Sequence, residues 1–180
     1  MSELTVFDDT ESQSPRVHTR DFDTIRRELD TVGIHFERWE ARQPLKPGAS
    51  QAEILEAYQD SVERLKKERG FKTADVLSMV PGHPDKVALR NKFLHEHTHS
   101  EDEVRFFVEG QGLFCIHKAG RVFNVLCEKG DLIAVPDGTP HWFDMGPQPR
   151  FTAIRLFTNT EGWVARPTGS DIASRFPRFE

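Results

Sequence analysis

The sequence HTHSEDEVRFFVEG, residues 97–110, and the later sequence GDLIAVPDGTPH, residues 130–141, indicate the fold most directly. The first stretch holds two histidines two positions apart and Glu103, and the second ends on His141. Residues two apart in a strand face the same way, so His97 and His99 can point to one side. Imidazole and carboxylate groups suit first-row divalent metals. The two stretches together predict a metal site formed by His97, His99, Glu103 and His141.

The sequence around these stretches alternates apolar and polar residues, which is typical of strands. Turn residues such as Gly110-Gln111-Gly112 and Lys129-Gly130 separate the segments. Many short strands with regular turns are typical of a β-sandwich or barrel. We expect residues 91–160 to form a metal-binding β-barrel core. The expected strands are 103–108, 113–117, 122–126, 132–135, 142–144 and 152–157.

The first half of the chain favours helices. Apolar residues at helical spacing from Phe22 to Val32, followed by Gly33, predict one helix. Ser50 and Glu53 form a capping box for a second helix that runs to Gly70. Residues 84–90 predict a further short helix, residues 34–39 a short strand, and residues 1–17 an irregular or edge segment. We therefore expect one domain, 1–180, mainly β, in which residues 1–90 are mostly helical elaboration.

The composition excludes several classes of protein. The 180 residues carry a formal net charge of −5, which argues against a dominant nucleic-acid surface. No segment approaches the roughly 20 apolar residues of a membrane span, so we expect no membrane partner. Residues 1–15 hold four acidic residues and no basic one, unlike a signal peptide, so we expect a cytoplasmic protein. Cys115 and Cys127 lie in apolar runs and are expected to be reduced core thiols.

Strand parity assigns a direction to the side chains after the first motif. Glu103, Arg105 and Phe107 share one face, so an inward Glu103 requires an inward Arg105. A guanidinium beside a metal is suited to bind an anion coordinated there. The other face, which includes Phe106, is expected to pack against the helices or a second sheet. Arg155, by its own alternation, either has the same role as Arg105 or lies at the barrel rim.

Several other residues near the motifs have less specific expected roles. His95 shares the parity of His97, but three imidazoles along one strand span too far for one ion at about 3.3 Å per residue. His95 is therefore expected beside the site or at its rim. Asp102 is expected to accept a hydrogen bond from a ligand imidazole. His117 is expected to pack or to face solvent. The aromatic side chains expected in the core, or around an apolar substrate tail, are Phe107, Trp142 and Phe143.

The spacings H-x-H-x3-E-x6-G and G-x5-P-x-G-x2-H are the two cupin motifs, and on them the chain resembles a cupin. Residues 93–110 and 135–143 resemble the acireductone dioxygenase family more narrowly, and Glu161-Gly162-Trp163 agrees. The resemblance implies a jelly-roll barrel, or double-stranded β-helix, with helices from the N-terminal half. It also implies that one Fe(II) or Ni(II) ion per chain is bound by His97, His99, Glu103 and His141.

The site itself favours chemistry on a substrate that binds through two oxygens. Four protein ligands leave two positions open on an octahedral ion, and Arg105 can help to stabilise an enediolate. The family resemblance implies that the substrate is 1,2-dihydroxy-3-keto-5-methylthiopentene, cleaved with O2 in methionine salvage. With Fe(II) the family yields 4-methylthio-2-oxobutanoate and formate. With Ni(II) it yields 3-methylthiopropanoate, formate and carbon monoxide.

Two alternatives remain open from the sequence. Another cupin metalloenzyme, such as a sugar-phosphate isomerase or a different dioxygenase, uses the same ligands. A phosphate-binding isomerase needs several converging basic groups, whereas only Arg105 and Arg155 are placed to serve. A non-enzymatic ligand-binding cupin is the second alternative, although such proteins commonly lose ligands. We expect a monomer, because no unpaired apolar edge is evident.

Overall fold

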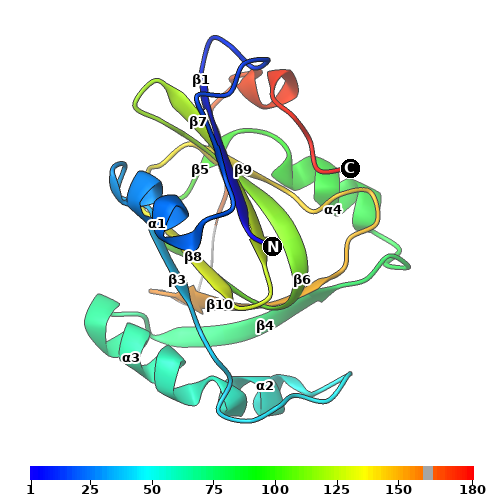
Figure 1. Ribbon diagram of the computed structural model, residues 1–180. Coiled ribbons are helices and arrows are strands. Elements are labelled where there is room, and N and C mark those ends of the chain that lie inside the picture. The colour runs from blue at the N-terminus through cyan, green and yellow to red at the C-terminus, as the bar shows by residue number, and fades with distance from the viewer. Residues whose placement is uncertain (160–163) are drawn as a thin grey trace.

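The computed structural model describes residues 1–159 and 164–180 (Figure 1). Its strands form one eleven-stranded hydrogen-bonded sheet that, over the described residues, does not close into a ring. The fold is therefore mainly β, as expected. The strands are β1 (Glu3–Asp8), β2 (Val17–Thr19), β3 (His35–Arg38), β4 (Thr73–Met79), β5 (His97–Thr98), β6 (Glu103–Lys118), β7 (Arg121–Glu128), β8 (Asp131–Val135), β9 (His141–Asp144), β10 (Phe151–Phe157) and β11 (Arg166–Pro167). The helices are α1 (Phe22–Asp30), α2 (Gln51–Ala57), α3 (Gln59–Arg69), α4 (Lys86–Phe93) and a C-terminal 3-10 helix, Ile172–Arg175.

Strand β6 connects the two halves of the sheet. Its first half pairs with β8 and β10, and its second half pairs with β7 and β9. The prediction of a turn at Gly110–Gly112 is wrong, because β6, a strand of 16 residues, runs through these positions without interruption. Gly110 has φ +77°, and a Cβ there would lie 2.0 Å from the carbonyl oxygen of Arg150. The glycine is thus required by a close approach of two backbones, not by a chain reversal.

A bulge in β6 changes which side chains face the interior. Thr152 lies opposite Glu109 and Ala153 opposite Phe107, so Val108 is an extra residue on β6. One extra residue reverses the alternation of faces along a strand. Phe107 before the bulge and Phe114 after it therefore both join the interior cluster. This is how one strand supplies inward side chains to both halves of the sheet.

The outer face of β6 is covered by helices, as the parity of the strand predicted. Val104, Phe106 and Val108 pack in a second cluster with Tyr58 and Leu65 from the α2–α3 region. Figure 1 shows α2 and α3 together at one end of the molecule, beside β4. A third cluster lies under the C-terminal 3-10 helix and includes both Cys115 and Trp142. Cys115 and Cys127 are buried free thiols, as expected.

The N-terminal half contains more strand than expected. Residues 1–17 are not irregular, because β1 pairs with β7 along six residues and buries Leu4 and Val6. Strands β1 to β4 all lie within residues 1–90, so the expectation of mostly helical elaboration is only partly correct. β4 was not expected at all. Its side chains are mostly half-buried, which leaves a weak apolar pattern in the sequence.

The predicted helices are present, with one interruption. α1 begins after Asp21, whose side chain accepts the amide N–H of Thr24. The capping box of Ser50 and Glu53 is present at the start of α2. Tyr58, with φ −111° and ψ 16°, then divides the expected helix into α2 and α3. None of the described helices is long and apolar enough to cross a membrane.

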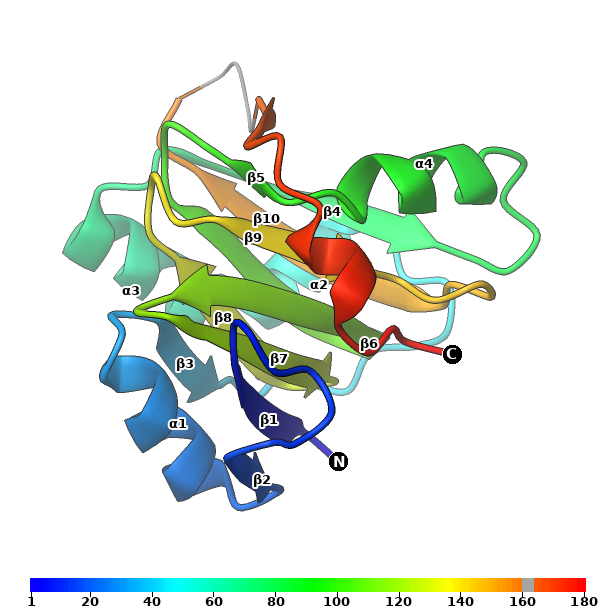
Figure 2. The ribbon, with the colours of Figure 1, turned by 90° about the horizontal axis from the view of Figure 1, so that it is seen from above.

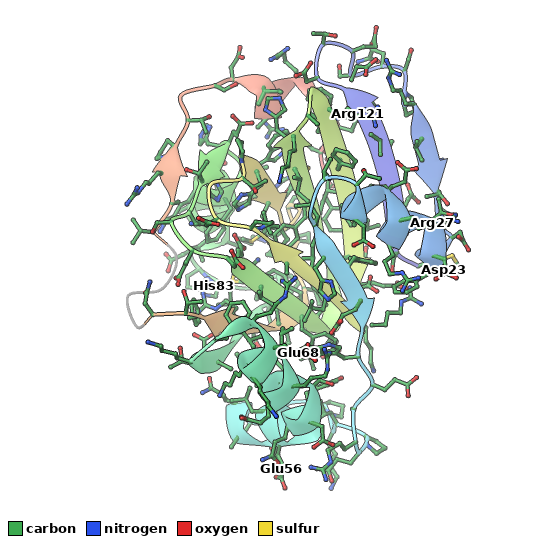
Figure 3. The ribbon with its side chains drawn as sticks, turned by 90° about the vertical axis from the view of Figure 1, so that its left-hand side faces the viewer. Asp23, Arg27, Glu56, Glu68, His83 and Arg121 are labelled. Carbon is green, nitrogen blue, oxygen red and sulfur yellow. The ribbon has the colours of Figure 1, made fainter. Side chains whose placement is uncertain are left out.

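The charged side chains of α2 and α3 form a solvated face. Figure 3 shows Glu56 on α2 and Glu68 on α3 at the outside of the molecule, and both residues are exposed. Glu68 accepts a hydrogen bond of 2.9 Å from Arg64, one turn earlier on the same helix. Exposed pairs of this kind contribute about 0.3–0.5 kcal/mol, so this face adds little to stability.

Glu37 on β3 is expected to make stability depend on acid pH. Burial raises its pKa, but hydrogen bonds from His35, Trp39 and Arg64 outweigh this and lower it to about 2. An unfolded glutamate has a pKa of about 4.3. The stabilisation is therefore complete above about pH 4.3 and is lost as the pH falls through about 2. In urea unfolding, the stability difference between the wild type and Glu37→Gln should shrink over this window. A difference that stays constant with pH would contradict the assignment.

Candidate metal centre

The four predicted ligands lie together at the interior of the sheet. The ligand atoms of His97, His99, Glu103 and His141 all lie within 4.8 Å of one another, and all four residues are buried. His97 on β5 is the register partner of His141 on β9, so the two motifs meet through a strand pair. The backbone N–H of Gly138 also donates to the carbonyl of His99 at 2.8 Å. These links hold the distant fourth residue against the local cluster.

Backbone carbonyls orient all three imidazoles. The Nδ1 atoms lie 2.7 Å from the carbonyl oxygen of His95 for His97, 3.1 Å from that of Val164 for His99, and 2.8 Å from that of Thr139 for His141. A carbonyl can only accept, so each Nδ1 carries the proton and donates it. Each Nε2 is thereby left without a proton in the neutral ring. That is the form in which imidazole binds a metal.

The distances from the Glu103 carboxylate to the imidazoles indicate whether a cation fits between the four ligand residues. Its Oε2 lies 3.0 Å from Nε2 of His99 and 2.9 Å from Nε2 of His141. A neutral imidazole that already donates through Nδ1 has no proton on Nε2 to offer the carboxylate. At each of the two contacts an oxygen lone pair therefore faces a nitrogen lone pair, and a cation between them would stabilise the arrangement. Two ligand atoms at right angles on an ion with bonds of about 2.1 Å lie about 3 Å apart. The spacing therefore suits one divalent ion that serves both contacts.

The electrostatics favour the ligand forms of His97 and Glu103. At His99 burial lowers the pKa, but the carboxylate of Glu103 outweighs this and raises it. Burial, together with the nearby His141, lowers the pKa of His97 to about 4, so that imidazole stays neutral. Burial alone would raise the pKa of Glu103. The close imidazoles of His141 and His99, with the charge of Arg105, instead hold it well below its usual range. The carboxylate is thus ionised and able to bind a cation.

Arg105 faces inward beside Glu103, as its strand parity predicted. Its Nη2 donates to Oε1 of Glu103 at 3.1 Å, and both side chains are buried. The guanidinium also lies over the rings of Phe143, at 4.6 Å, and Phe114, at 5.3 Å. The aromatic faces attract the cation and help to hold it in this position. The placement suits a group that binds an anion next to the ligand cluster.

A cavity of about 760 Å³ opens from this cluster, lined by three of the ligand residues and by Arg105. Figure 2 shows α4 on the side of β5 and β9, opposite to α1, β1 and β2. Because Phe93 of α4 lines the cavity, the cavity lies on the same side of the molecule as α4. Gly112 leaves space for the ring of Phe143, which lines the cavity, since a Cβ at position 112 would lie 2.5 Å from that ring. The apolar side chains of this wall include Leu77, Phe93, Phe143, Phe157 and Val164.

The aromatic residues divide between core and cavity. Phe143 lines the cavity, which agrees with one of its two expected places. Phe107 is fully buried in the interior cluster, and Trp142 lies on the opposite face under the C-terminal 3-10 helix. The direction of β9 explains this, because adjacent residues of a strand point to opposite faces.

Arg155 also lines the cavity, but its guanidinium is already occupied. Its Nε and Nη2 lie 2.8 and 2.6 Å from the two carboxylate oxygens of Asp75. The sequence offered both an inward and a rim position for Arg155, and the structure places it on the cavity wall. Asp75 was missed because β4 was not expected.

The remaining candidates do not join the ligand cluster. His95 is exposed, and its backbone carbonyl rather than its ring contacts His97. Asp102 does not accept from an imidazole as expected, because backbone carbonyls already take all three Nδ1 protons. It accepts instead the backbone N–H of Asp137 at 3.0 Å. Glu161-Gly162-Trp163, which supported the family resemblance, lies outside the described residues.

His117 lies in a separate polar network behind the site. Its Nδ1 lies 2.7 Å from Glu96, and its Nε2 lies 3.2 Å from Asp9. Glu96 is buried and also accepts from the hydroxyl of Thr168 at 2.7 Å. Glu96 immediately precedes His97, the first residue of β5, so this network holds the start of β5 in place. No sequence pattern indicates this network, since its members are far apart in the chain.

Replacing Glu96 with glutamine is expected to weaken metal binding without removing it. The change removes a charge that holds β5 in place but leaves every ligand, so a loss of up to about tenfold in affinity is expected. Competition with a coloured chelator measures this, with the exposed Glu56→Gln as the matched control. Equal affinity for Glu96→Gln and the wild type would show that the network does not position His97.

This fold and site define a metal-binding enzyme of the cupin class. A model of the ARD/ARD′ family matches residues 3–165. The chain therefore belongs to the ARD/ARD′ family. It is 59% identical to an acireductone dioxygenase of Marinobacter nauticus and 58% identical to one of Hahella chejuensis, in each case over 100% of this chain and 97% of the relative. Among solved structures it is similar to an acireductone dioxygenase from Bacillus anthracis with a cadmium ion in its active centre. That match has a TM-score of 0.79 and 30% identity over 92% of this chain and 98% of the other.

Proposed function

We propose that this protein cleaves the acireductone 1,2-dihydroxy-3-keto-5-methylthiopentene with O2, as an enzyme of methionine salvage. The observation that carries the proposal is the cluster of His97, His99, Glu103 and His141 at a cavity that also holds Arg105. The identity of 59% to an acireductone dioxygenase over the whole chain supports the same substrate class. A cavity of about 760 Å³ has room for a substrate of this size.

The residues of the cavity have separate tasks in this proposal. His97, His99, Glu103 and His141 would hold one divalent ion, which supplies stabilisation of negative charge on a bound enediolate. Arg105 binds the anionic oxygens at the polar end of the substrate. Apolar side chains such as Leu77, Phe143 and Phe157 seat the methylthio tail and exclude water from it. The Nδ1–H bonds to backbone carbonyls keep the imidazoles in fixed directions while substrate enters and leaves.

We propose Fe(II) or Ni(II), one per chain, as the working ion. Nitrogen and oxygen ligands accept both, and the general affinity order favours Ni(II) over Fe(II) while cellular supply differs. A cadmium ion occupies the active centre of the Bacillus anthracis relative, which supports a divalent cation in this position. The product route is expected to follow the ion that is loaded.

A product assay tests this proposal. Metal-free protein is loaded separately with Fe(II) and Ni(II) and supplied with the acireductone and O2. The Fe(II) form is expected to give keto acid and formate, and the Ni(II) form 3-methylthiopropanoate, formate and carbon monoxide. The same products from both forms would contradict the proposed control by the metal.

We further propose that the protein works as a cytoplasmic monomer without nucleic-acid partners. The buried free thiols Cys115 and Cys127 suit a reducing compartment. Large apolar side chains exposed on the described residues are few: Met1, Val80, Val87 and Val164. Light scattering coupled to size exclusion measures the mass, and a stable dimer would contradict the monomer.

A further inference from the structure

Three charged side chains lie in a row across three adjacent strands of the cavity wall. Asp75 on β4 is the register partner of Arg155 on β10, and Arg155 is the register partner of Arg105 on β6. All three line the cavity that opens from the metal-ligand cluster. The cavity thus contains two neighbouring guanidiniums, of which the proposed chemistry uses the one beside Glu103.

The two guanidiniums are held in different ways. Arg155 makes a two-point contact with Asp75, at 2.8 and 2.6 Å, and lies 5.2 Å from the ring of Phe157. Arg105 makes a contact of 3.1 Å with Glu103 and stacks on Phe143. A two-point contact is the geometry in which an arginine binds the carboxylate of a ligand. Asp75 therefore occupies on Arg155 the place that a ligand carboxylate would take.

The Asp75–Arg155 pair can also be reached from the cavity. The side chain of Arg155 is 27% exposed and that of Asp75 is 37% exposed, whereas Arg105 and Glu103 are each 5% exposed. An incoming anion can therefore compete with Asp75 for Arg155. With Asp75 ionised the pair is neutral, so an anion gains little charge attraction there.

We propose that Asp75 is a specificity-determining residue that closes Arg155 to anionic ligands. Building on the proposed function, the cavity then accepts a substrate with one anionic end, bound near Arg105, and an apolar tail. A ligand with a second anionic group on its tail is disfavoured, because its charge would meet Asp75. Neutralising Asp75 would make Nε and Nη2 of Arg155, the two donors that now contact Asp75, available to the carboxylate of a dianion.

The test compares two four-carbon anions that differ in one charge. Titration calorimetry measures the binding of butanoate and of succinate to the metal-loaded protein. The wild type is expected to bind succinate no better than butanoate. Asp75→Asn and the smaller Asp75→Ser are expected to raise the preference for succinate at least about tenfold, which is about 1.4 kcal/mol. Asp75→Glu keeps the charge and should behave as the wild type.

A double variant separates this effect from direct binding of succinate to the metal. The gain should disappear in Asp75→Asn with Arg155→Met, because the released guanidinium is then absent. Unchanged preference in both single neutral variants, or a gain that persists in the double variant, would overturn the proposal. Turnover of the acireductone by the wild type is measured separately, so a failure of the proposed function is distinguishable from a failure of the role of Asp75.

Discussion

Replacing Glu103 with glutamine is expected to release the metal ion and to abolish turnover. Glu103 supplies the negative charge of the ligand cluster and contacts His99 and His141 at 3.0 and 2.9 Å. Its loss should reduce metal affinity by more than the roughly 10–100-fold caused by loss of an outer partner of a ligand. It also removes the buried carboxylate that Arg105 contacts at 3.1 Å, which is destabilising. We therefore expect a lower melting temperature as well.

Metal analysis after dialysis measures the first effect, and thermal unfolding the second. Glu109→Gln is the matched control, because Glu109 is exposed on the same strand and contributes nothing to the cluster. A Glu103→Gln protein that retains one ion per chain with full affinity would contradict the proposed ligand set.

Replacing Arg105 with methionine is expected to leave the metal bound but to remove most of the turnover. Methionine fills the space against Phe114 and Phe143 but cannot bind the anionic oxygens of the substrate. The loss of one preorganised donor to developing charge typically lowers turnover by about 10²–10³-fold. The metal content should stay near that of the wild type, since Arg105 contributes no ligand atom.

Steady-state kinetics and metal analysis on the same preparation separate the two roles. The exposed Arg121→Met, on β7, controls for loss of a positive charge far from the cavity. Full turnover in Arg105→Met would show that this guanidinium does not act on the substrate.

The metal cluster could be predicted from the sequence because its determinants are local. Three of its residues lie within 97–103: His97 is in β5, His99 follows that strand, and Glu103 begins β6. His141 follows turn residues that return the chain to the same strand pair. Arg105 was predicted by parity alone, and the structure places it beside Glu103.

The bulge and the strands of the N-terminal half could not be predicted in this way. Gly110 and Gly112 resemble a turn in the sequence, yet they serve close packing against Arg150 and Phe143. Only the pairing with β10 reveals that Val108 is an extra residue. β1 depends on pairing with β7, more than a hundred residues later, which no local pattern encodes.

Asp75 was missed for a related reason. β4 carries a weak alternation, because it is an edge strand that pairs with β10 alone among the described strands. Without that strand, nothing in the sequence connects Asp75 with Arg155. The sequence therefore left open whether Arg155 shares the role of Arg105, and the structure shows Arg155 in a two-point contact with Asp75.

O2 uptake on addition of the acireductone shows directly whether the metal cluster supports dioxygen chemistry. Protein loaded with one ion per chain is compared with metal-free protein and with buffer alone. We expect rapid uptake of one O2 per acireductone by the loaded protein, and only background uptake by the metal-free protein. Background uptake by fully loaded protein would contradict the assignment of this site to dioxygen chemistry.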